Sequence, residues 1–191
     1  VLGEDITLNG TKNWNPIGTN GASFSGIFDG LGHTISNLHI NDSSKDYMGL
    51  FGSTSTTSLI KNLHLTNVDL EGKNFVGGLI GYGRGDVSNV FVQGKVKGNN
   101  NVGGVLGLSN SGDYNQFNSL QHLISSVNVT GVGYSVGGLI GSLGVSNLSS
   151  SYSVGSVIGD SKVGGLIGSA DSGKPSKPTN IKKSYATGSV S

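Results

Sequence analysis

The hexapeptide Val76-Gly77-Gly78-Leu79-Ile80-Gly81 decides how this chain folds, because it recurs along most of the sequence. Further copies begin at Val102, Val136 and Val163, and a shorter version, Met48-Gly49-Leu50-Phe51-Gly52, precedes them. The closing glycines of successive copies are 29, 26, 34 and 27 residues apart: Gly52, Gly81, Gly107, Gly141 and Gly168. A period of this length indicates a supersecondary unit that stacks on copies of itself, as in solenoids.

A second motif alternates with the first and reads Ile60-Lys61-Asn62-Leu63-His64-Leu65 in its clearest copy. Its alternation of apolar and polar residues is typical of a strand with one buried and one wet face. Other copies begin at these apolar residues: Ile35, Val87, Ile124, Leu148 and Ile181. The first two copies place His39 and His64 at equivalent positions, which predicts that they stack.

The two motifs together predict an all-β chain. No single coil can bury its apolar side, but coils stacked ~4.8 Å apart would align Val, Leu and Ile into interior rows. Glycines in the first motif would let backbones approach closely. We therefore expect a right-handed parallel β-helix of about five or six coils.

Composition supports this fold and excludes several classes of protein. Glycine supplies 34 of the 191 residues, and each glycine costs a helix about 1 kcal/mol. The formal charge is +1 with acids and bases dispersed, so no basic stretch follows a nucleic acid, and no apolar run is long enough for membrane insertion. Cysteine is absent, which excludes a disulfide framework and thiolate metal sites.

The chain begins inside strand-like sequence at Val1 and stops just after a repeat half. We expect one β-solenoid segment over residues 1–191, cut from a longer protein and monomeric as a fragment. Residues 1–47 would form lead-in coils, and residues 48–191 would carry the repeats.

The repeats resemble those of the GLUG-motif family, named for a Gly-Leu-x-Gly core, over almost the whole chain. Such repeats occur in bacterial surface or secreted proteins, including adhesins of the filamentous-haemagglutinin type and the N-terminal region of IgA-specific metalloendopeptidases. The resemblance implies a secreted or cell-surface location, a host glycan or receptor as partner, and no catalytic centre or cofactor. Val105 departs from the pattern, because leucine is usual there, and so does the long interval before the fourth copy.

Loops that break the period are where solenoids usually carry function. The interval from 109 to 121 combines Asp113, Tyr114, Asn115 and Gln116, and an aromatic ring beside amides and a carboxylate suits sugar binding. The alternative is a solvated loop without a ligand. A second polar insertion spans residues 169–180.

Two shorter patterns also suggest surface chemistry. Arg84-Gly85-Asp86 spells a tripeptide that integrins can bind, although Gly-Asp is also ordinary turn sequence. Four asparagines stand in Asn-x-Ser/Thr glycosylation patterns: Asn9, Asn41, Asn128 and Asn147.

Three hypotheses for function follow. The first is a non-catalytic, host-binding segment of an adhesin that presents loops to glycans. The second is a structural stalk of a large surface protein. The third is a polysaccharide-degrading enzyme, which needs clustered carboxylates. The acids Asp29, Asp86, Asp113 and Asp160 share no coil offset, and no histidine spacing suits a metal, so we predict neither catalytic nor metal-binding residues.

Overall fold

A computed structural model describes residues 1–112, 116–171 and 179–191, which form strands and turns without a helix. The strands form three sheets with parallel pairing, here called the long, four-stranded and five-stranded sheets. The long sheet contains β1 (Ile6–Thr7), β2 (Ile27–Asp29), β3 (Thr34–Ser36), β4 (His39–Asn41), β6 (Leu59–Glu71), β9 (Asp86–Gly98), β12 (Asn118–Gly131), β15 (Ser146–Ser149), β16 (Tyr152–Ser153), β17 (Val157–Ile158), β20 (Asn180–Lys182) and β21 (Tyr185–Ala186). The four-stranded sheet contains β7 (Asn74–Gly77), β10 (Asn100–Gly103), β13 (Tyr134–Gly137) and β18 (Ser161–Gly164). The five-stranded sheet contains β5 (Phe51–Ser53), β8 (Ile80–Gly83), β11 (Leu106–Ser109), β14 (Ile140–Leu143) and β19 (Ile167–Ala170).

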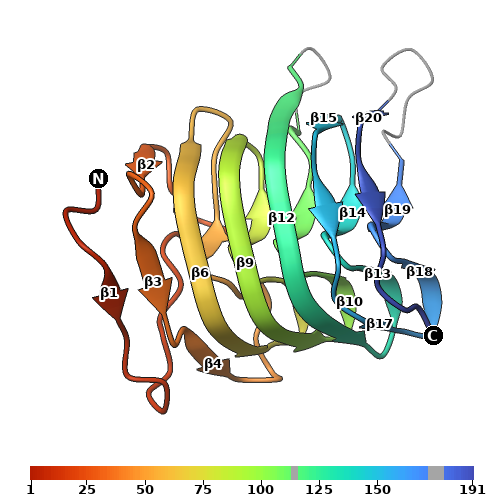
Figure 1. The fold of residues 1–191 in the computed structure, drawn as a ribbon, viewed down its shortest axis with the longest axis horizontal. Helices are drawn as coiled ribbons and strands as arrows, with labels where there is room; N and C mark the ends of the chain where they lie inside the picture. The colour runs from red at the N-terminus through yellow and green to blue at the C-terminus, as the bar shows by residue number, and fades with distance from the viewer. Residues whose placement is uncertain (113–115, 172–178) are drawn as a thin grey trace.

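From β6 to β19 the chain visits the long, the four-stranded and the five-stranded sheet in this order in each coil. In Figure 1 the strands of the long sheet run downward in front, and the chain returns upward behind them while advancing to the right, so the solenoid is right-handed. Seven successive strands lie along the long sheet in the order β1-β3-β6-β9-β12-β15-β20, which corresponds to about six turns. The predicted right-handed parallel β-helix is confirmed.

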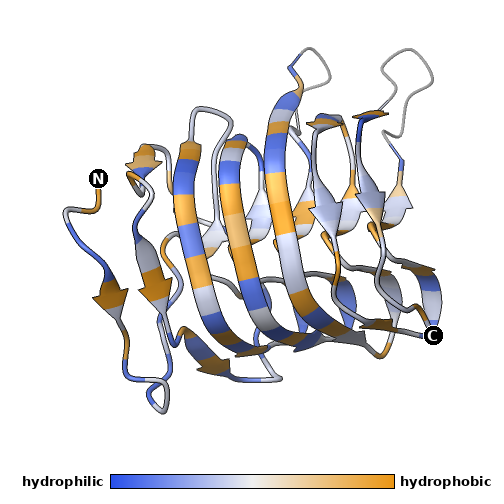
Figure 2. Cartoon of the chain, viewed as in Figure 1, coloured by the Kyte–Doolittle hydropathy of each residue, from blue (hydrophilic) through white to orange (hydrophobic). Residues whose placement is uncertain are grey.

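Apolar residues form continuous rows inside the solenoid. In the long sheet Val87 pairs with both Ile60 and Leu120, and all three side chains are buried. The four-stranded sheet aligns Val102 with Val76 and Val136 in the same way. Figure 2 shows the resulting alternation of apolar and polar bands along β6, β9 and β12. Complete burial of such a side chain contributes about 1.5–3 kcal/mol, so these rows supply most of the stabilisation.

The repeated glycines let two sheets meet backbone to backbone. A Cβ atom added to Gly103 would lie 2.0 Å from the Leu106 carbonyl oxygen and 2.6 Å from the Gly141 backbone nitrogen. A Cβ atom on Gly141 would lie 2.6 Å from the Val102 backbone nitrogen. Residues of the four-stranded and five-stranded sheets are therefore too close for any side chain at these positions. The predicted close approach is confirmed, and Val105 fits the leucine position fully buried.

Two rows of residues with positive φ form corners at the same place in successive coils. The first row is Asn62, Asn89, His122, Ser150 and Lys183, with φ between 48° and 54°. The second row is Tyr47, Phe75, Asn101, Ser135 and Lys162, with φ between 51° and 63°. Asparagine tolerates this conformation, whereas phenylalanine and lysine do so rarely. Since neighbouring coils have the same corner, stacking imposes positive φ on residue types that rarely adopt it on their own.

The coil that contains β2 to β5 differs from the expected alignment, and it is called the first coil here because it is the first to carry both motifs. His64 pairs with Thr34, whereas His39 pairs with Asp69, so the predicted stacking of the two histidines is wrong. Ile60 pairs with Phe28 rather than with Ile35. Between β2 and β3 the first coil contains additional residues at its corner, which shifts the second motif along the strand.

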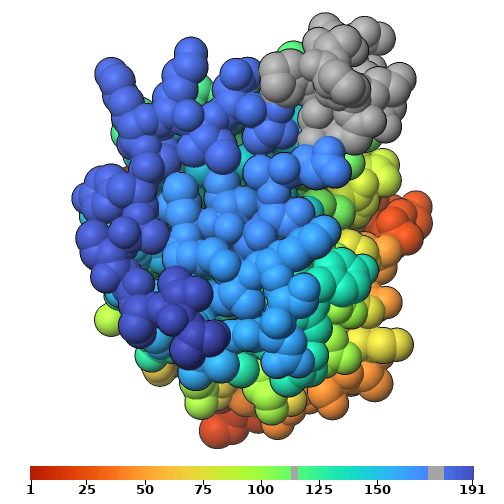
Figure 3. Space-filling model, turned by 90° about the vertical axis from the view of Figure 1, so that its right-hand side faces the viewer, coloured from red at the N-terminus to blue at the C-terminus, as the bar shows by residue number. Residues whose placement is uncertain are grey.

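The long interval before the fourth copy leaves the coil regular. β12 begins at Asn118, and its Leu120 pairs with Val87 and Leu148 in the neighbouring coils. Figure 3 views the end formed by the last coil. Interior rows continue into this coil, but Ile181 is 44% exposed and Val190 is 48% exposed there.

Candidate functional site

The outer face of the long sheet carries a row of aromatic and aliphatic side chains along the solenoid axis. Phe91 pairs with His64 and Ile124, and Tyr152 pairs with Ile124 and Tyr185. The rings of His64 and Phe91 are nearly perpendicular, with centroids 6.1 Å apart. The rings of Tyr152 and Tyr185 are parallel, with centroids 5.2 Å apart. Parallel stacking covers the ring faces between neighbours and leaves mainly ring edges toward solvent.

Beside this row lies a hollow of about 580 Å³, which we call the polar hollow. Amide and hydroxyl side chains from four successive coils provide most of its lining. The lining residues are Asn67, Gln93, Gly94, Ser126, Asn128, Val154, Gly155 and Ser156. Four coils at ~4.8 Å each span about 14 Å between the first and the last, which is long enough for several units of an extended polymer.

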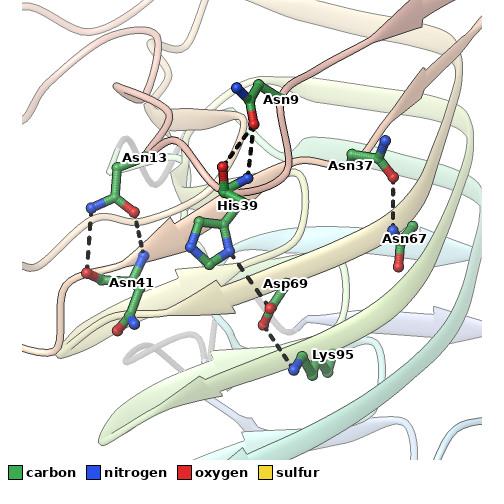
Figure 4. Close-up of polar contacts among 9 residues, drawn as sticks. Asn9, Asn13, Asn37, His39, Asn41, Asn67, Asp69 and Lys95 are labelled. Atoms are coloured by element: carbon green, nitrogen blue, oxygen red, sulfur yellow. Dashed lines mark hydrogen bonds and ion pairs between the residues drawn. The ribbon is translucent and has the colours of Figure 1, made fainter.

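The polar side chains of this hollow keep hydrogen-bonding capacity for a ligand. Asn128 Oδ1 accepts hydrogen bonds from the Ser156 backbone nitrogen at 3.2 Å and from Ser156 Oγ at 2.9 Å, which leaves the Asn128 amide hydrogens available. Asn67 Nδ2 donates to Asn37 Oδ1 at 2.7 Å, which leaves Asn67 Oδ1 as an acceptor (Figure 4). Gln93 is exposed. The hollow therefore offers donors and acceptors together, the combination that sugar hydroxyls require.

Charges near the polar hollow are paired between neighbouring coils. Asp69 Oδ1 lies 3.3 Å from Lys95 Nζ, and Asp69 Oδ2 lies 3.5 Å from His39 Nδ1 (Figure 4). Lys97 Nζ lies 3.0 Å from Glu71 Oε1. No residue that lines the hollow is charged. This arrangement favours a neutral ligand.

The site predicted in the period-breaking loop falls partly outside the described residues, because these exclude Asp113, Tyr114 and Asn115. Gln116 is described and exposed, and its Nε2 donates to the Thr56 carbonyl oxygen at 3.4 Å. Gln116 precedes β12, whereas Asn128 lies near the end of that strand. Ten residues of strand separate Asn118 from Asn128, a path of roughly 33 Å, so Gln116 lies apart from the polar hollow.

The Arg84-Gly85-Asp86 tripeptide lies in the turn between β8 and β9 and is held in place there. The Arg84 guanidinium carbon lies 4.8 Å from the centre of the Tyr82 ring. Gly85 is buried, and Asp86 Oδ1 accepts a hydrogen bond from the Ser119 backbone nitrogen at 2.8 Å. Receptor binding by this tripeptide stays a prediction.

The four asparagines in glycosylation patterns are all exposed: Asn9, Asn41, Asn128 and Asn147. Asn9 Oδ1 accepts hydrogen bonds from the backbone nitrogen and the hydroxyl of Thr11, at 3.1 and 2.9 Å. Asn147 Oδ1 accepts from Asn180 Nδ2 at 2.9 Å. Asn128 also lines the polar hollow, so a glycan attached there would occupy the hollow. Modification of these residues stays a prediction.

Acidic side chains of the described residues gather neither in the polar hollow nor in a metal site. Among the described residues, no group of three or more His, Asp or Glu side chains could hold a metal ion. Hydrogen bonds from the Leu31 backbone nitrogen and from Asn62 lower the pKa of Asp29, and a hydrogen bond from the Thr34 backbone nitrogen lowers the pKa of Asp5. Both carboxyls lie away from the hollow. In the part of the chain that is described, no helix could span a membrane.

Sequence reasoning missed most residues of the polar hollow. Asn67, Gln93, Ser126 and Ser156 are ordinary polar residues of the repeat, and they become neighbours only through the pairing of successive coils. Their one sequence signal is that they lie within a copy of the second motif or just after one.

Comparison with known proteins places this chain beside much longer ones, although no family model matches it. Over 85 residues, 44% of the chain, it is 46% identical to halomucin of Haloquadratum walsbyi, of which this match covers 1%. Over 100 residues, 48% of the chain, it is 37% identical to a Gly-rich membrane protein of Evansella cellulosilytica, of which it covers 12%.

A solved structure shares the whole fold. The crystal structure of a Bacteroides ovatus protein assigned as an immunoglobulin A1 protease superposes with a TM-score of 0.74 at 25% identity, over 97% of this chain and 59% of that one. The chain thus spans a small part of both curated relatives and about three fifths of the solved chain. It is a β-solenoid similar to one segment of each of these larger proteins.

Proposed function

We propose that this chain is a non-catalytic segment of a surface or secreted protein, and that it binds carbohydrate through the polar hollow. Similarity to halomucin and to a membrane protein supports the location. Similarity to a protein assigned as an immunoglobulin A1 protease supports a role beside a catalytic domain, in agreement with the resemblance to GLUG-repeat proteins. A host cell-surface glycan is the partner that this role implies.

One observation carries the proposal. Amide and hydroxyl groups from four coils converge on one uncharged hollow of about 580 Å³. Neutral sugars present alternating donor and acceptor hydroxyls, and pairs of amides and hydroxyls match them without a net charge. The lining contains no carboxylate, whereas glycoside hydrolysis typically needs two. The hollow is therefore suited to binding rather than cleavage.

Glycan-array binding with Gln93→Ala and Asn128→Ala variants tests the proposal. Each truncation removes hydrogen bonds worth about 0.5–1.5 kcal/mol, so we expect about 2- to 10-fold weaker binding for each single variant and more for the double variant. Ser88→Ala is a matched control, because Ser88 faces outward from the same sheet but does not line the hollow. Retention of full binding by the double variant would refute the role of the hollow.

A structural stalk is the second candidate function, and the amide ladders favour it. Asn100 Nδ2 donates to Asn74 Oδ1 at 2.8 Å, and Asn89 Nδ2 donates to Asn62 Oδ1 at 3.1 Å. These bonds join successive coils along the axis and would stiffen a spacer. The stalk hypothesis predicts no glycan binding by this segment, so the same array separates the two functions.

A further inference from the structure

A second hollow of about 380 Å³ lies where the lead-in segment meets the first corner of the four-stranded sheet. Two chain segments line it, one from the lead-in and one from the connection before β5. The lining residues are Asn15, Pro16, Gly18, Thr19, Asn20, Lys45, Asp46, Tyr47 and Met48. We call it the tyrosine hollow. None of these residues lines the polar hollow.

Tyr47 gives this hollow a rigid aromatic wall. Its ring stacks on Phe75 of the next coil, with centroids 5.0 Å apart and planes 7° apart. The Tyr82 ring lies 6.3 Å from the Tyr47 ring at a tilt of 40° and supports the pair from the side. Phe75 covers one face of Tyr47 and does not line the hollow, so the opposite face and the edge of the Tyr47 ring are the parts that can border it. A ligand that stacks there pays little for ordering the ring.

The corner conformation of Tyr47 has a structural origin. Its φ of 63° recurs at Phe75, Asn101, Ser135 and Lys162 in the following coils. Positive φ therefore belongs to the corner and says nothing of binding. What distinguishes Tyr47 is that it stands at the N-terminal end of this row, stacks on Phe75 and lines a hollow.

Polar groups surround the aromatic wall. Asn74 donates two hydrogen bonds to Asp46 Oδ1, one from its backbone nitrogen at 3.1 Å and one from Nδ2 at 2.9 Å. Asp46 Oδ2 therefore keeps its capacity to accept hydrogen bonds from hydroxyl groups. Asn15 and Asn20 are exposed at the rim. Lys45 Nζ lies 3.1 Å from Asp42 Oδ2, so its charge is partly compensated.

We propose that the tyrosine hollow binds one neutral pyranose residue, with its apolar face on the Tyr47 ring and its hydroxyls toward Asp46 Oδ2. An aromatic platform beside a few convergent polar groups is the usual form of a small-ligand site, and the volume lies within the range of roughly 300–1,000 Å³ for such sites. The Asp46 carboxylate disfavours an acidic sugar. This inference is independent of the polar hollow, since the two sites share no residue.

Ligand-observed saturation-transfer NMR with galactose, N-acetylglucosamine and N-acetylneuraminic acid tests the proposal on the intact chain. We expect one or both neutral sugars to bind and the acidic sugar not to bind. Tyr47→Ala and Tyr47→Leu should weaken binding at least 10-fold, because both remove the flat ring, while the leucine still packs on Phe75. Tyr47→Phe should bind within about 3-fold of the parent. Tyr134→Ala is the matched control, since Tyr134 is 51% exposed and lies outside the hollow.

Thermal unfolding of each variant separates lost binding from lost folding, and Tyr47→Leu preserves the test if the alanine variant unfolds. No binding of either neutral sugar, or undiminished binding by Tyr47→Leu, would overturn the proposal. So would binding of a proline-rich peptide at Tyr47 in the absence of sugar binding. Because the polar hollow is also proposed to bind neutral sugars, the Tyr47 variants are also measured in a Gln93→Ala/Asn128→Ala background. Sugar binding that remains in this background and depends on Tyr47 belongs to the tyrosine hollow, so failure here and failure of the polar hollow are distinguishable.

Discussion

Replacing Gly103 with alanine tests whether the repeated glycines are required for backbone contact between the four-stranded and five-stranded sheets. The added Cβ atom would stand 2.0 Å from the Leu106 carbonyl oxygen and 2.6 Å from the Gly141 backbone nitrogen, whereas ordinary contacts begin at 3.4 Å. Relief requires one backbone to move by more than 1 Å relative to the other. Gly103 has no positive φ, so the effect is steric rather than conformational.

The magnitude follows from what resists that movement. Overpacking in a rigid core costs about 1–3 kcal/mol. The Val105 backbone nitrogen donates to the Leu139 carbonyl oxygen at 2.9 Å, and weakening such a buried bond costs about 1–3 kcal/mol more. Alanine also reduces the conformational entropy of the unfolded chain, which offsets about 0.4–1 kcal/mol of this destabilisation. These contributions combine to about 1–5 kcal/mol, and we expect Gly103→Ala to lower the free energy of unfolding by about 2–4 kcal/mol, near the middle of that range.

Urea denaturation followed by far-UV circular dichroism measures this change, with a thermal melt as a second assay. For a chain of this size the melting temperature should fall by about 4–16 °C. The slope of the urea transition must be compared as well, because a solenoid can lose coils separately.

Two further glycines provide controls. Gly3→Ala should change stability by less than about 0.5 kcal/mol, because no atom lies within 4 Å of its added Cβ. Gly164→Ala should cost less than Gly103→Ala, because its Cβ meets the Ile167 carbonyl oxygen at 2.0 Å but no backbone nitrogen closer than 3.6 Å. If Gly103→Ala were as stable as Gly3→Ala, the backbone contact would not explain the repeat.

Two other predictions concern a buried hydroxyl and a surface carboxylate. Ser153 Oγ is buried without a hydrogen-bond partner among the described residues, so Ser153→Ala should raise the free energy of unfolding by about 1 kcal/mol; a lower melting temperature would contradict this. Hydrogen bonds from the Leu31 backbone nitrogen and from Asn62, with Lys61 nearby, lower the pKa of Asp29 below 3.8, so its stabilising contribution is present above that pH and is lost as the pH falls through the folded-state pKa. Asp29→Asn should therefore lose less stability than the parent when acid titration of the melting temperature runs from about pH 5 to pH 2, and parallel curves would count against the prediction.

The fold was predictable because its determinants are local and repeated. The hexapeptide at 76–81 combines close backbone approach with three interior side chains, those of Val76, Leu79 and Ile80, and each copy carries the same information. The corners could be predicted only in part. Asn62 and Asn89 are of a residue type that accepts positive φ. His122 and Lys183 adopt the same conformation because their coils stack on the coils that contain the asparagines.

The polar hollow could not be predicted, because it depends on register between coils. A shift of one residue in pairing would turn Gln93 away from Ser126 and reverse the faces of the strand. The first coil shows how easily such alignment fails, since Ile60 pairs with Phe28 and not with Ile35. The interval from 109 to 121 can be recognised in the sequence because it breaks the period. The polar hollow lies within regular coils, where no such break marks it.

The two faces of the long sheet separate the residues that fold the chain from those of the proposed binding site. Interior positions repeat the same kind of residue in successive coils, as at Val87 and Leu120, because each must fill the same volume. The outer row passes from His64 through Phe91 and Ile124 to tyrosine without disturbing the pairing beneath it. Since backbone ladders and interior rows hold the coil, outer residues are free to vary. Gln93 is exposed, so its substitution should change the proposed binding without changing folding, whereas Asn128 also accepts two hydrogen bonds from Ser156 of the next coil. Any glycan specificity would therefore depend on outer residues such as Gln93.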